Sequence, residues 1–120
     1  HVPGKEVAKS VLLRKGNGDE YILVVLPATH YVDMDRIRRR LGDADIEMAS
    51  EEDITRVFPD CETGAIPPFG SLYQILTLMD ESLSEDEQIV FENQTHEDSI
   101  RMQFRDYESL EHPTMGRFSF

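Results

Sequence analysis

The run Tyr21-Ile22-Leu23-Val24-Val25-Leu26 decides the fold of this chain. It has no polar position after Tyr21, so it lacks the alternation of polar and apolar residues that a strand with one exposed face shows. A strand of this composition is typical of the centre of a sheet that is covered on both faces. Pro27 ends the run, since proline has no N–H group to donate to a neighbouring strand.

A second strand is predicted over residues 7–13, directly before this run. The two segments are separated by the turn-forming cluster Lys15-Gly16-Asn17-Gly18-Asp19. Two apolar runs joined by such a cluster predict an antiparallel hairpin.

Lys9 departs from the apolar pattern of this first strand. Alternate side chains of a strand share a face, so Lys9 is in phase with the apolar residues Val7, Val11 and Leu13. An ammonium group on an apolar face must be solvated or paired. Two explanations stay open. The long side chain reaches water near an edge of the sheet, or it lies at the floor of a cleft and meets a phosphate, a carboxylate or a developing oxyanion.

Two short helices are predicted in the middle of the chain. The first has Asp33 as its N-cap, apolar residues at helical spacing, and Gly42 as its stop. The second has Ser50 as its N-cap, with Asp53 three residues later in the position of a capping box. Pro59 ends this second helix.

Three further strands are predicted in the second half of the chain, over residues 73–79, 88–92 and 99–105. The last shows the clearest alternation, because polar residues separate its apolar residues Ile100, Met102 and Phe104. The acidic connector 80–87 is expected to be solvated.

A short helix over residues 106–110 completes the pattern. The elements together predict an α+β domain of five or six mostly antiparallel strands and two or three helices. The chain has 120 residues, 39% of them apolar, which is enough for one core and too few for two. We therefore expect one domain.

Composition also bears on the compartment. No apolar run approaches the ~18 to 20 residues that a membrane span needs, and residues 1–15 lack the layout of a signal peptide. The single cysteine, Cys61, cannot form an internal disulfide. We expect a cytoplasmic protein with no membrane partner.

The charge balance is strongly acidic. The chain carries 24 acidic and 12 basic side chains, a net charge of −12, which repels a polyanion. Four of the basic residues nevertheless lie close together, at Arg36, Arg38, Arg39 and Arg40. They form either a positive patch for an anionic partner or an ordinary solvated helix face.

The loop over residues 64–70 is the second unusual segment. Gly64 and Gly70 flank Pro67-Pro68, so the backbone is stiff in its middle and free of side-chain bulk at both ends. Amide N–H groups of such a loop could form an oxyanion pocket. An ordinary rigid connector has the same composition.

Histidine and cysteine side chains are the remaining candidates for chemistry. His96 lies in a polar turn, where it is either merely exposed or suited to proton transfer and ligand binding. Cys61 has no histidine near it in sequence, which favours a structural role over that of a nucleophile. No pair of histidines or cysteines has ligand spacing on one element, so we expect no metal and no other cofactor.

Three segments resemble the YbaK/prolyl-tRNA-synthetase-associated family in the family's order. The segment 2–13 is similar to its early strand, whose lysine falls on Lys9. The segment 64–70 resembles its Gly-x-x-x-Pro motif, with Gly64 and Pro68 in the two named places. Residues 95–110 are similar to the closing turn, strand and helix of the family. The resemblance thus touches nearly the whole chain.

This resemblance implies a curled, barrel-like, mostly antiparallel sheet flanked by short helices. It also implies hydrolysis, in trans and without metal, of the ester that joins a wrong amino acid to the 3′-terminal adenosine of a tRNA. The implied partners are mischarged tRNA and an aminoacyl-tRNA synthetase. Such an ester is already activated, so catalysis mainly needs a positioned water and a polarised carbonyl.

The resemblance assigns roles to particular residues. Lys9 would bind the phosphate of the terminal adenosine or support the ester, Gly64 would supply backbone donors, and His96 would line the pocket or relay a proton. The remaining substrate contacts are expected from Pro68, Phe69, Gly70 and Thr95, and from Arg38 and Arg39 of the basic run.

Two departures from the family pattern bear on the function. Relatives have a helical segment upstream of the lysine strand, which this chain, as a shortened member, would lack. Many relatives have small residues where this chain has Asn93-Gln94, which would change the size or polarity of the pocket. The missing segment and the net charge of −12 favour an alternative, a non-catalytic module that senses an amino acid or a charged tRNA.

Overall fold

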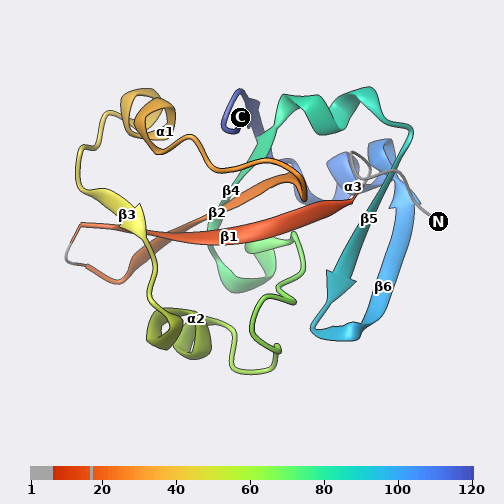
Figure 1. Cartoon of the computed structure of the whole chain (residues 1–120), viewed down its shortest axis with the longest axis horizontal. Helices are drawn as coiled ribbons and strands as arrows, with labels where there is room; N and C mark the ends of the chain where they lie inside the picture. The colour runs from red at the N-terminus through yellow and green to blue at the C-terminus, as the bar shows by residue number, and fades with distance from the viewer. Residues whose placement is uncertain (1–6, 17) are drawn as a thin grey trace.

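The computed structural model describes residues 7–16 and 18–120. Within this part the chain forms two sheets and three α-helices (Figure 1). The strands are β1 (Ala8–Lys15), β2 (Glu20–Pro27), β3 (Ile46–Met48), β4 (Leu76–Asp80), β5 (Gln88–Asn93), β6 (Thr95–Gln103) and β7 (Thr114–Gly116). The helices are α1 (Met34–Leu41), α2 (Glu51–Val57) and α3 (Phe104–Glu111), with 3₁₀ helices η2 (Gly70–Tyr73) and η3 (Glu81–Glu85).

The main sheet has the strand order β3-β1-β2-β4-β7. Its central strand, β2, pairs antiparallel with β1 and parallel with β4. Every residue of β2 from Ile22 to Pro27 is buried. The prediction that residues 21–26 form a central strand covered on both faces is therefore confirmed, and Pro27 is the last residue of that strand.

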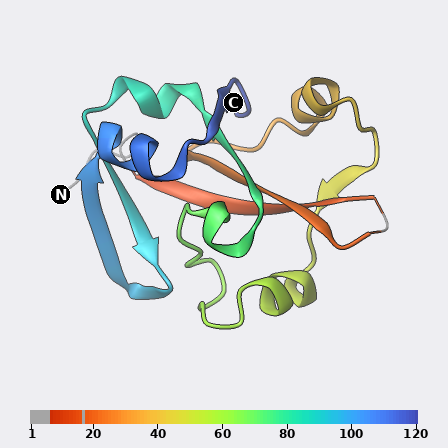
Figure 2. The ribbon, with the colours of Figure 1, turned by 180° about the vertical axis from the view of Figure 1, so that it is seen from behind.

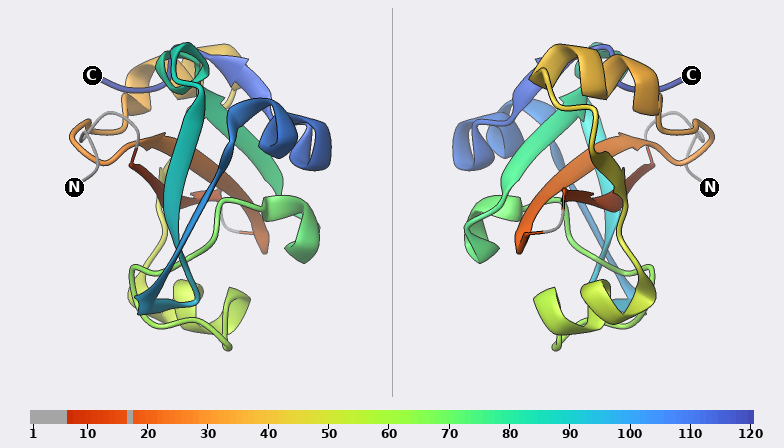
Figure 3. Two further views of the ribbon diagram at one scale, coloured as in Figure 1. Left: turned by 90° about the vertical axis from the view of Figure 1, so that its right-hand side faces the viewer. Right: turned by 90° about the vertical axis from the view of Figure 1, so that its left-hand side faces the viewer.

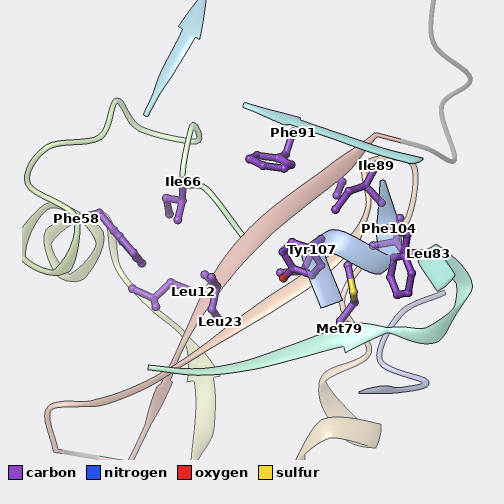
Figure 4. Packing of buried hydrophobic residues seen from close by; sticks show 12 residues of the cluster. Leu12, Leu23, Phe58, Ile66, Met79, Leu83, Ile89, Phe91, Phe104 and Tyr107 are labelled. Atoms are coloured by element: carbon purple, nitrogen blue, oxygen red, sulfur yellow. The ribbon is translucent and has the colours of Figure 1, made fainter. Parts of the chain in front are cut away.

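The two faces of β2 contact two separate apolar clusters. Ile22, Val24 and Leu26 pack with Ile37 of α1 and with Phe118, and we call this side the α1 face. Leu23 and Val25 point to the opposite face, where they pack against the second sheet and the loop before η2. Figure 4 shows this larger cluster, which includes Leu12, Phe58, Ile66, Phe91 and Tyr107. We call this side the loop face.

The smaller sheet is the antiparallel hairpin of β5 and β6, and it covers part of the loop face. Figure 2 shows α3 continuing directly from β6 and lying beside it. The views in Figures 1 and 3 agree in placing α1 at one end of the molecule, with α2 and the loop that follows α2 at the other. The two faces of the main sheet are thus covered by different elements, the α1 face by α1 and the loop face by the β5–β6 hairpin and the loop before η2.

Helix boundaries agree closely with the sequence prediction. The Asp33 carboxylate accepts a hydrogen bond from the Arg36 amide at 3.1 Å, and Gly42 ends α1 with φ +64°. Ser50 and Asp53 form a reciprocal capping box at the start of α2. No helix within the described residues is long and apolar enough to span a bilayer.

Several strand predictions were wrong in detail. The strand predicted over 99–105 ends at Gln103, because Phe104 begins α3 and is buried there. The strand predicted over 73–79 begins only at Leu76, after η2. The connector 80–87 is not simply solvated, since η3 buries Leu83 in the core.

The sheet itself also differs from a barrel. It is not closed, and both β2–β4 and β4–β7 are parallel pairs, although the β1–β2, β1–β3 and β5–β6 pairs are antiparallel as expected. The three-residue strands β3 and β7 were missed, since they are too short for a periodicity signal.

Candidate functional site

The loop before η2 is joined to the β5–β6 turn by main-chain hydrogen bonds. The Glu62 amide donates to the Gln94 carbonyl at 2.7 Å, and the Gln94 amide donates to the Ala65 carbonyl at 2.8 Å. Gln94 has φ +71°, a conformation that glycine adopts most easily. Its side chain donates to Asp60 at 2.8 Å, which adds a further contact between the turn and the loop.

Gly64 lies against the ring of His96. A Cβ atom added at Gly64 would be 3.4 Å from His96 Cε1, and Gly64 has φ +85°, where L-residues are strained. The positive φ makes glycine the suitable residue here, whereas the distance to His96 is an ordinary van der Waals contact. Gly64 and His96, to which the family resemblance assigns catalytic roles, are thus neighbours in the structure.

Both nitrogens of the His96 ring have hydrogen-bond acceptors as partners. Nδ1 is 2.7 Å from a carboxylate oxygen of Glu92, and Nε2 is 2.6 Å from the Thr63 carbonyl oxygen. A neutral imidazole can donate through only one nitrogen, so two acceptors favour the doubly protonated ring. The Thr63 carbonyl and the Glu92 carboxylate accordingly raise the pKa of His96 above its ordinary value.

The amides beside this ring include donors without a partner. Within the described residues, Ala65 N–H donates to the Glu62 carbonyl, whereas the N–H groups of Thr63, Gly64 and Ile66 make no hydrogen bond. Ile66 is 5% exposed, and a buried amide without a partner is costly. The loop therefore offers unpaired backbone donors next to a cationic ring, an arrangement suited to an oxyanion.

The next residues of the loop are held in the core. Pro67, Pro68 and Gly70 are buried. The ring of Phe69 packs against Phe91 and Tyr107, with centroids 5.7 and 5.1 Å apart. The predicted substrate contacts Pro68 and Gly70 are thus buried, whereas Gly64 is exposed.

Gly70 has a packing reason to be glycine. Its amide donates to the Thr77 hydroxyl at 3.0 Å, and a Cβ atom at Gly70 would overlap that hydroxyl and lie 2.8 Å from the Ile75 carbonyl oxygen. Thr95, the other predicted contact in the closing turn, is hydrogen-bonded to Asp98 at 3.1 Å.

Lys9 is not brought to Gly64 and His96. It pairs in register with Leu26, whose side chain belongs to the α1 face, whereas Ile66 and the rest of the loop pack on the loop face. The Lys9 side chain is half-buried, and its Nζ lies 5.6 Å from the centroid of the Tyr31 ring. The ammonium is thus in a cation–π contact on the other side of the sheet.

Ser10 is a residue that the sequence analysis missed. It follows Lys9 and alternates with Ala8 and Leu12, so it points to the loop face. Its Oγ is buried and has no hydrogen-bond partner within the described residues. The available signal in the sequence was a serine that alternates with the apolar residues Ala8 and Leu12. That its hydroxyl has no hydrogen-bond partner is evident only once the residues packed on the loop face are known.

Arg38 and Arg39 lie on α1, away from Gly64. Arg38 Nε donates to the Ile46 carbonyl at 2.8 Å, and Arg38 also faces Asp35 of its own helix. Arg39 is exposed.

Cys61 has the environment of a structural thiol. It is half-buried against the larger cluster, and burial raises its pKa above the ordinary value. Burial likewise raises the pKa of the neighbouring Tyr73 to about 12. A protonated thiol is a poor nucleophile. Within the described residues, no three His, Cys, Asp or Glu side chains are grouped so as to hold a metal ion.

Comparison with known proteins gives a family and a fold. The family model of the aminoacyl-tRNA editing domain matches residues 1–110. No curated protein sequence matches the chain significantly.

Several solved structures share the fold at low sequence identity. One, a proposed trans-editing enzyme for prolyl-tRNA synthetase, superposes with a TM-score of 0.85 at 16% identity, covering 99% of this chain and 73% of that chain. A hypothetical protein gives 0.87 at 14% identity, covering 99% and 77%. A proposed signal transduction protein from Marinobacter aquaeolei gives 0.82 at 21% identity, covering 98% of this chain and 26% of that chain.

Proposed function

The chain belongs to the aminoacyl-tRNA editing domain family, and from this we propose that it hydrolyses mischarged aminoacyl-tRNA in trans. The observation that carries the proposal is the set of unpaired amides at Gly64 and Ile66 beside the His96 ring. These groups suit an ester carbonyl whose oxygen gains negative charge during hydrolysis.

The reaction needs little beyond positioning and charge stabilisation. Water attacks the carbonyl carbon of the ester, the amides stabilise the resulting oxyanion, and the bond between this carbon and the ribose oxygen then breaks. The ribose oxygen takes up a proton, so the products are the free amino acid and tRNA with an intact 3′ end. A hydroxyl of the terminal ribose helps to activate the water, and no metal takes part in the proposal.

His96 and Lys9 have different roles in this proposal. His96, which is favoured as a cation, adds positive charge beside the Gly64 amide and lines the entrance to the site. Lys9 lies on the opposite face of the sheet, so a contact with a phosphate of the terminal nucleotides suits it better than one with the ester. The side chain of Ser10 points to the loop face, toward the loop, whereas that of Lys9 points to the opposite face.

The partner and compartment follow from the same proposal. A structural neighbour is a proposed trans-editing enzyme for prolyl-tRNA synthetase, which supports an aminoacyl-tRNA synthetase as the source of the mischarged product. The activity then belongs to the cytoplasm, where translation takes place.

The proposal is tested with a panel of mischarged tRNAs and the variant Gly64→Ala. An alanine side chain is strained at φ +85°, so the loop must shift and move the amide of residue 64 away from the ester oxygen. We therefore expect amino acid release to fall at least about tenfold. Gly42→Ala is the matched control, because Gly42 also has positive φ but has no atom within 4 Å of an added Cβ. Equal turnover of the two variants would remove Gly64 from the mechanism.

A second candidate is a non-catalytic module that binds an amino acid or a charged tRNA. It is favoured by the separation of Lys9 from Gly64, and by the occurrence of the fold within a much longer signal transduction protein. Binding of a non-hydrolysable aminoacyl-adenosine analogue, with no turnover of any tRNA in the panel, would select this candidate over the hydrolase.

A further inference from the structure

We infer that a pocket lined by Arg36, Arg39, Arg40 and Arg117 binds the phosphate backbone of the tRNA substrate. We call it the arginine pocket. It lies between α1 and the segment that follows β7, and has a volume of about 530 Å³. The inference rests on the proposed function for the identity of the nucleic acid, but its observations are independent of the Gly64 site.

The charge in the arginine pocket is opposite to that of the whole protein. Four guanidinium groups line it, with Glu81 as the opposing carboxylate, whereas the chain as a whole carries −12. A polyanion is repelled by most of such a surface, so a concentrated positive region determines where it can approach. Repulsion elsewhere and attraction here together orient the ligand.

Helix stability alone does not account for this arrangement. Basic residues in the last turn of a helix interact favourably with its dipole, which explains why Arg39 and Arg40 suit α1. Arg117 does not belong to α1 and comes from near the other end of the sequence. Its presence in the same pocket brings a further cation close to like charges, which costs free energy unless an anion binds.

Arg40 is held in position by several contacts. Its guanidinium lies over the Phe118 ring, 5.5 Å from the centroid, and donates to the Met115 carbonyl at 3.4 Å. Gly116 makes room for this stack, because a Cβ atom there would be 2.6 Å from both Arg40 Nη1 and Phe118 Cζ. The Phe118 amide in turn donates to the buried Asp80 carboxylate at 2.8 Å, which fixes the whole segment.

Arg39 and Arg117 are available to a ligand. Both are exposed, and neither has a hydrogen bond or ion pair with any other residue in the part of the chain that the structure describes. Arg36 is partly neutralised by Asp33, with Nε 3.6 Å from the carboxylate. The arginine pocket thus combines one fixed guanidinium with two free ones, and guanidinium groups match phosphate oxygens in two-pronged geometry.

Several separated guanidinium groups suit a chain of phosphates better than one small anion. Arg38 does not extend the arginine pocket, because its guanidinium already donates hydrogen bonds to the Ile46 carbonyl and to Asp35. Of the two arginines that the sequence analysis assigned to the substrate, only Arg39 therefore belongs to the arginine pocket.

The inference is tested by the binding of deacylated tRNA, measured by fluorescence anisotropy between about 50 and 200 mM salt. The double variant Arg39→Gln/Arg117→Gln should weaken binding at least about tenfold at the lowest salt. It should also reduce the slope of log K against log salt concentration by about 1 to 2, as for the loss of one or two phosphate contacts.

The control variant removes the same charge elsewhere. Arg101→Gln/Arg105→Gln changes two exposed arginines on β6 and α3, and should leave affinity and slope nearly unchanged. Arg38→Gln tests a neighbour on the same helix. Equal losses of tRNA affinity in the two double variants would mean that net charge alone matters, and would overturn the inference. Unchanged affinity in Arg39→Gln/Arg117→Gln would also overturn it. Thermal melting of each variant verifies folding.

Failure of this inference is distinguishable from failure of the proposed function. Hydrolysis of an aminoacyl-adenosine ester, which lacks the tRNA body, should be the same in the parent and in Arg39→Gln/Arg117→Gln. If the parent hydrolyses no ester but the double variant still loses tRNA affinity, the arginine pocket stands and the hydrolase fails. Inorganic phosphate binding at the pocket without any tRNA binding would identify a small-anion site and overturn the inference.

Discussion

The hydroxyl of Tyr107 on α3 donates a hydrogen bond to the carbonyl oxygen of Pro68, at a distance of 2.5 Å. Tyr107 is fully buried, and burial raises its pKa well above the ordinary value, so the phenol keeps its proton. The contact connects a helix near the end of the chain with the double-proline loop. It also satisfies a carbonyl that lies out of reach of solvent.

Tyr107→Phe should therefore destabilise the protein by about 1 to 2 kcal/mol, because the Pro68 carbonyl is left buried without a donor. The ring and its packing against Phe69 are retained, so the change isolates the hydroxyl. Chemical denaturation measures the free energy of unfolding. Tyr31→Phe, at a site 69% exposed, is the control and should change it little. An equal effect of both variants would contradict the assigned role.

His96 should make stability depend on pH. Its folded pKa is raised by Thr63 and Glu92, so the doubly protonated ring contributes stability that is fully present below the ordinary pKa of about 6.5. This contribution is lost as the pH rises through the raised pKa of the folded state. The melting temperature of the parent should accordingly fall over that window relative to the melting temperature of His96→Gln.

The same experiment has two checks. Glu92→Gln removes one acceptor and should reduce the pH dependence in the same direction, since Glu92 is the carboxylate bonded to Nδ1. His112→Gln changes an exposed histidine at the end of α3 and should leave the pH dependence of the melting temperature the same as in the parent. Parallel melting curves for the parent and His96→Gln from pH 6 to pH 9 would rule out the proposed protonation.

Local signals explain the parts of the fold that the sequence predicted well. Asp33, Gly42 and Ser50 act through bonds to residues a few positions away, so their caps can be recognised without knowledge of tertiary structure. The central position of β2 was also predictable, because an uninterrupted apolar run of six residues leaves no side for solvent.

Other features depend on contacts that no local pattern records. Phe104 continued the alternation of a strand, but its side chain is buried as the first residue of α3. The phase of Lys9 with Val11 was predicted correctly, yet periodicity does not tell which loop covers each face of the sheet. The placement of Gly64 with His96, and of both away from Lys9, needed the packing of the second sheet. Their catalytic roles stay predictions.

Ser50→Ala should destabilise the protein by about 1 kcal/mol, the usual effect of removing an N-cap side chain. The Ser50 hydroxyl accepts from the Asp53 amide at 3.1 Å and donates to the Asp53 carboxylate at 2.9 Å, so both bonds are lost. Ser99→Ala, at an exposed position of β6, should have little effect. Denaturation midpoints compare the two, and a null result at Ser50 would mean that α2 is held by packing alone.

Lys9→Ala should affect substrate binding more than the chemical step. Lys9 lies on the α1 face of the sheet, whereas the Gly64 loop packs on the loop face, so in the proposed function its charge suits a phosphate better than the reacting carbonyl. We expect KM for mischarged tRNA to rise about tenfold with kcat nearly unchanged, the pattern of lost uniform binding. Lys15→Ala removes the same charge from the far end of β1, where Lys15 faces Glu20, and should alter neither constant. A fall in kcat with unchanged KM in Lys9→Ala would instead mean that the ammonium reaches the ester, and that the sheet rearranges when substrate binds.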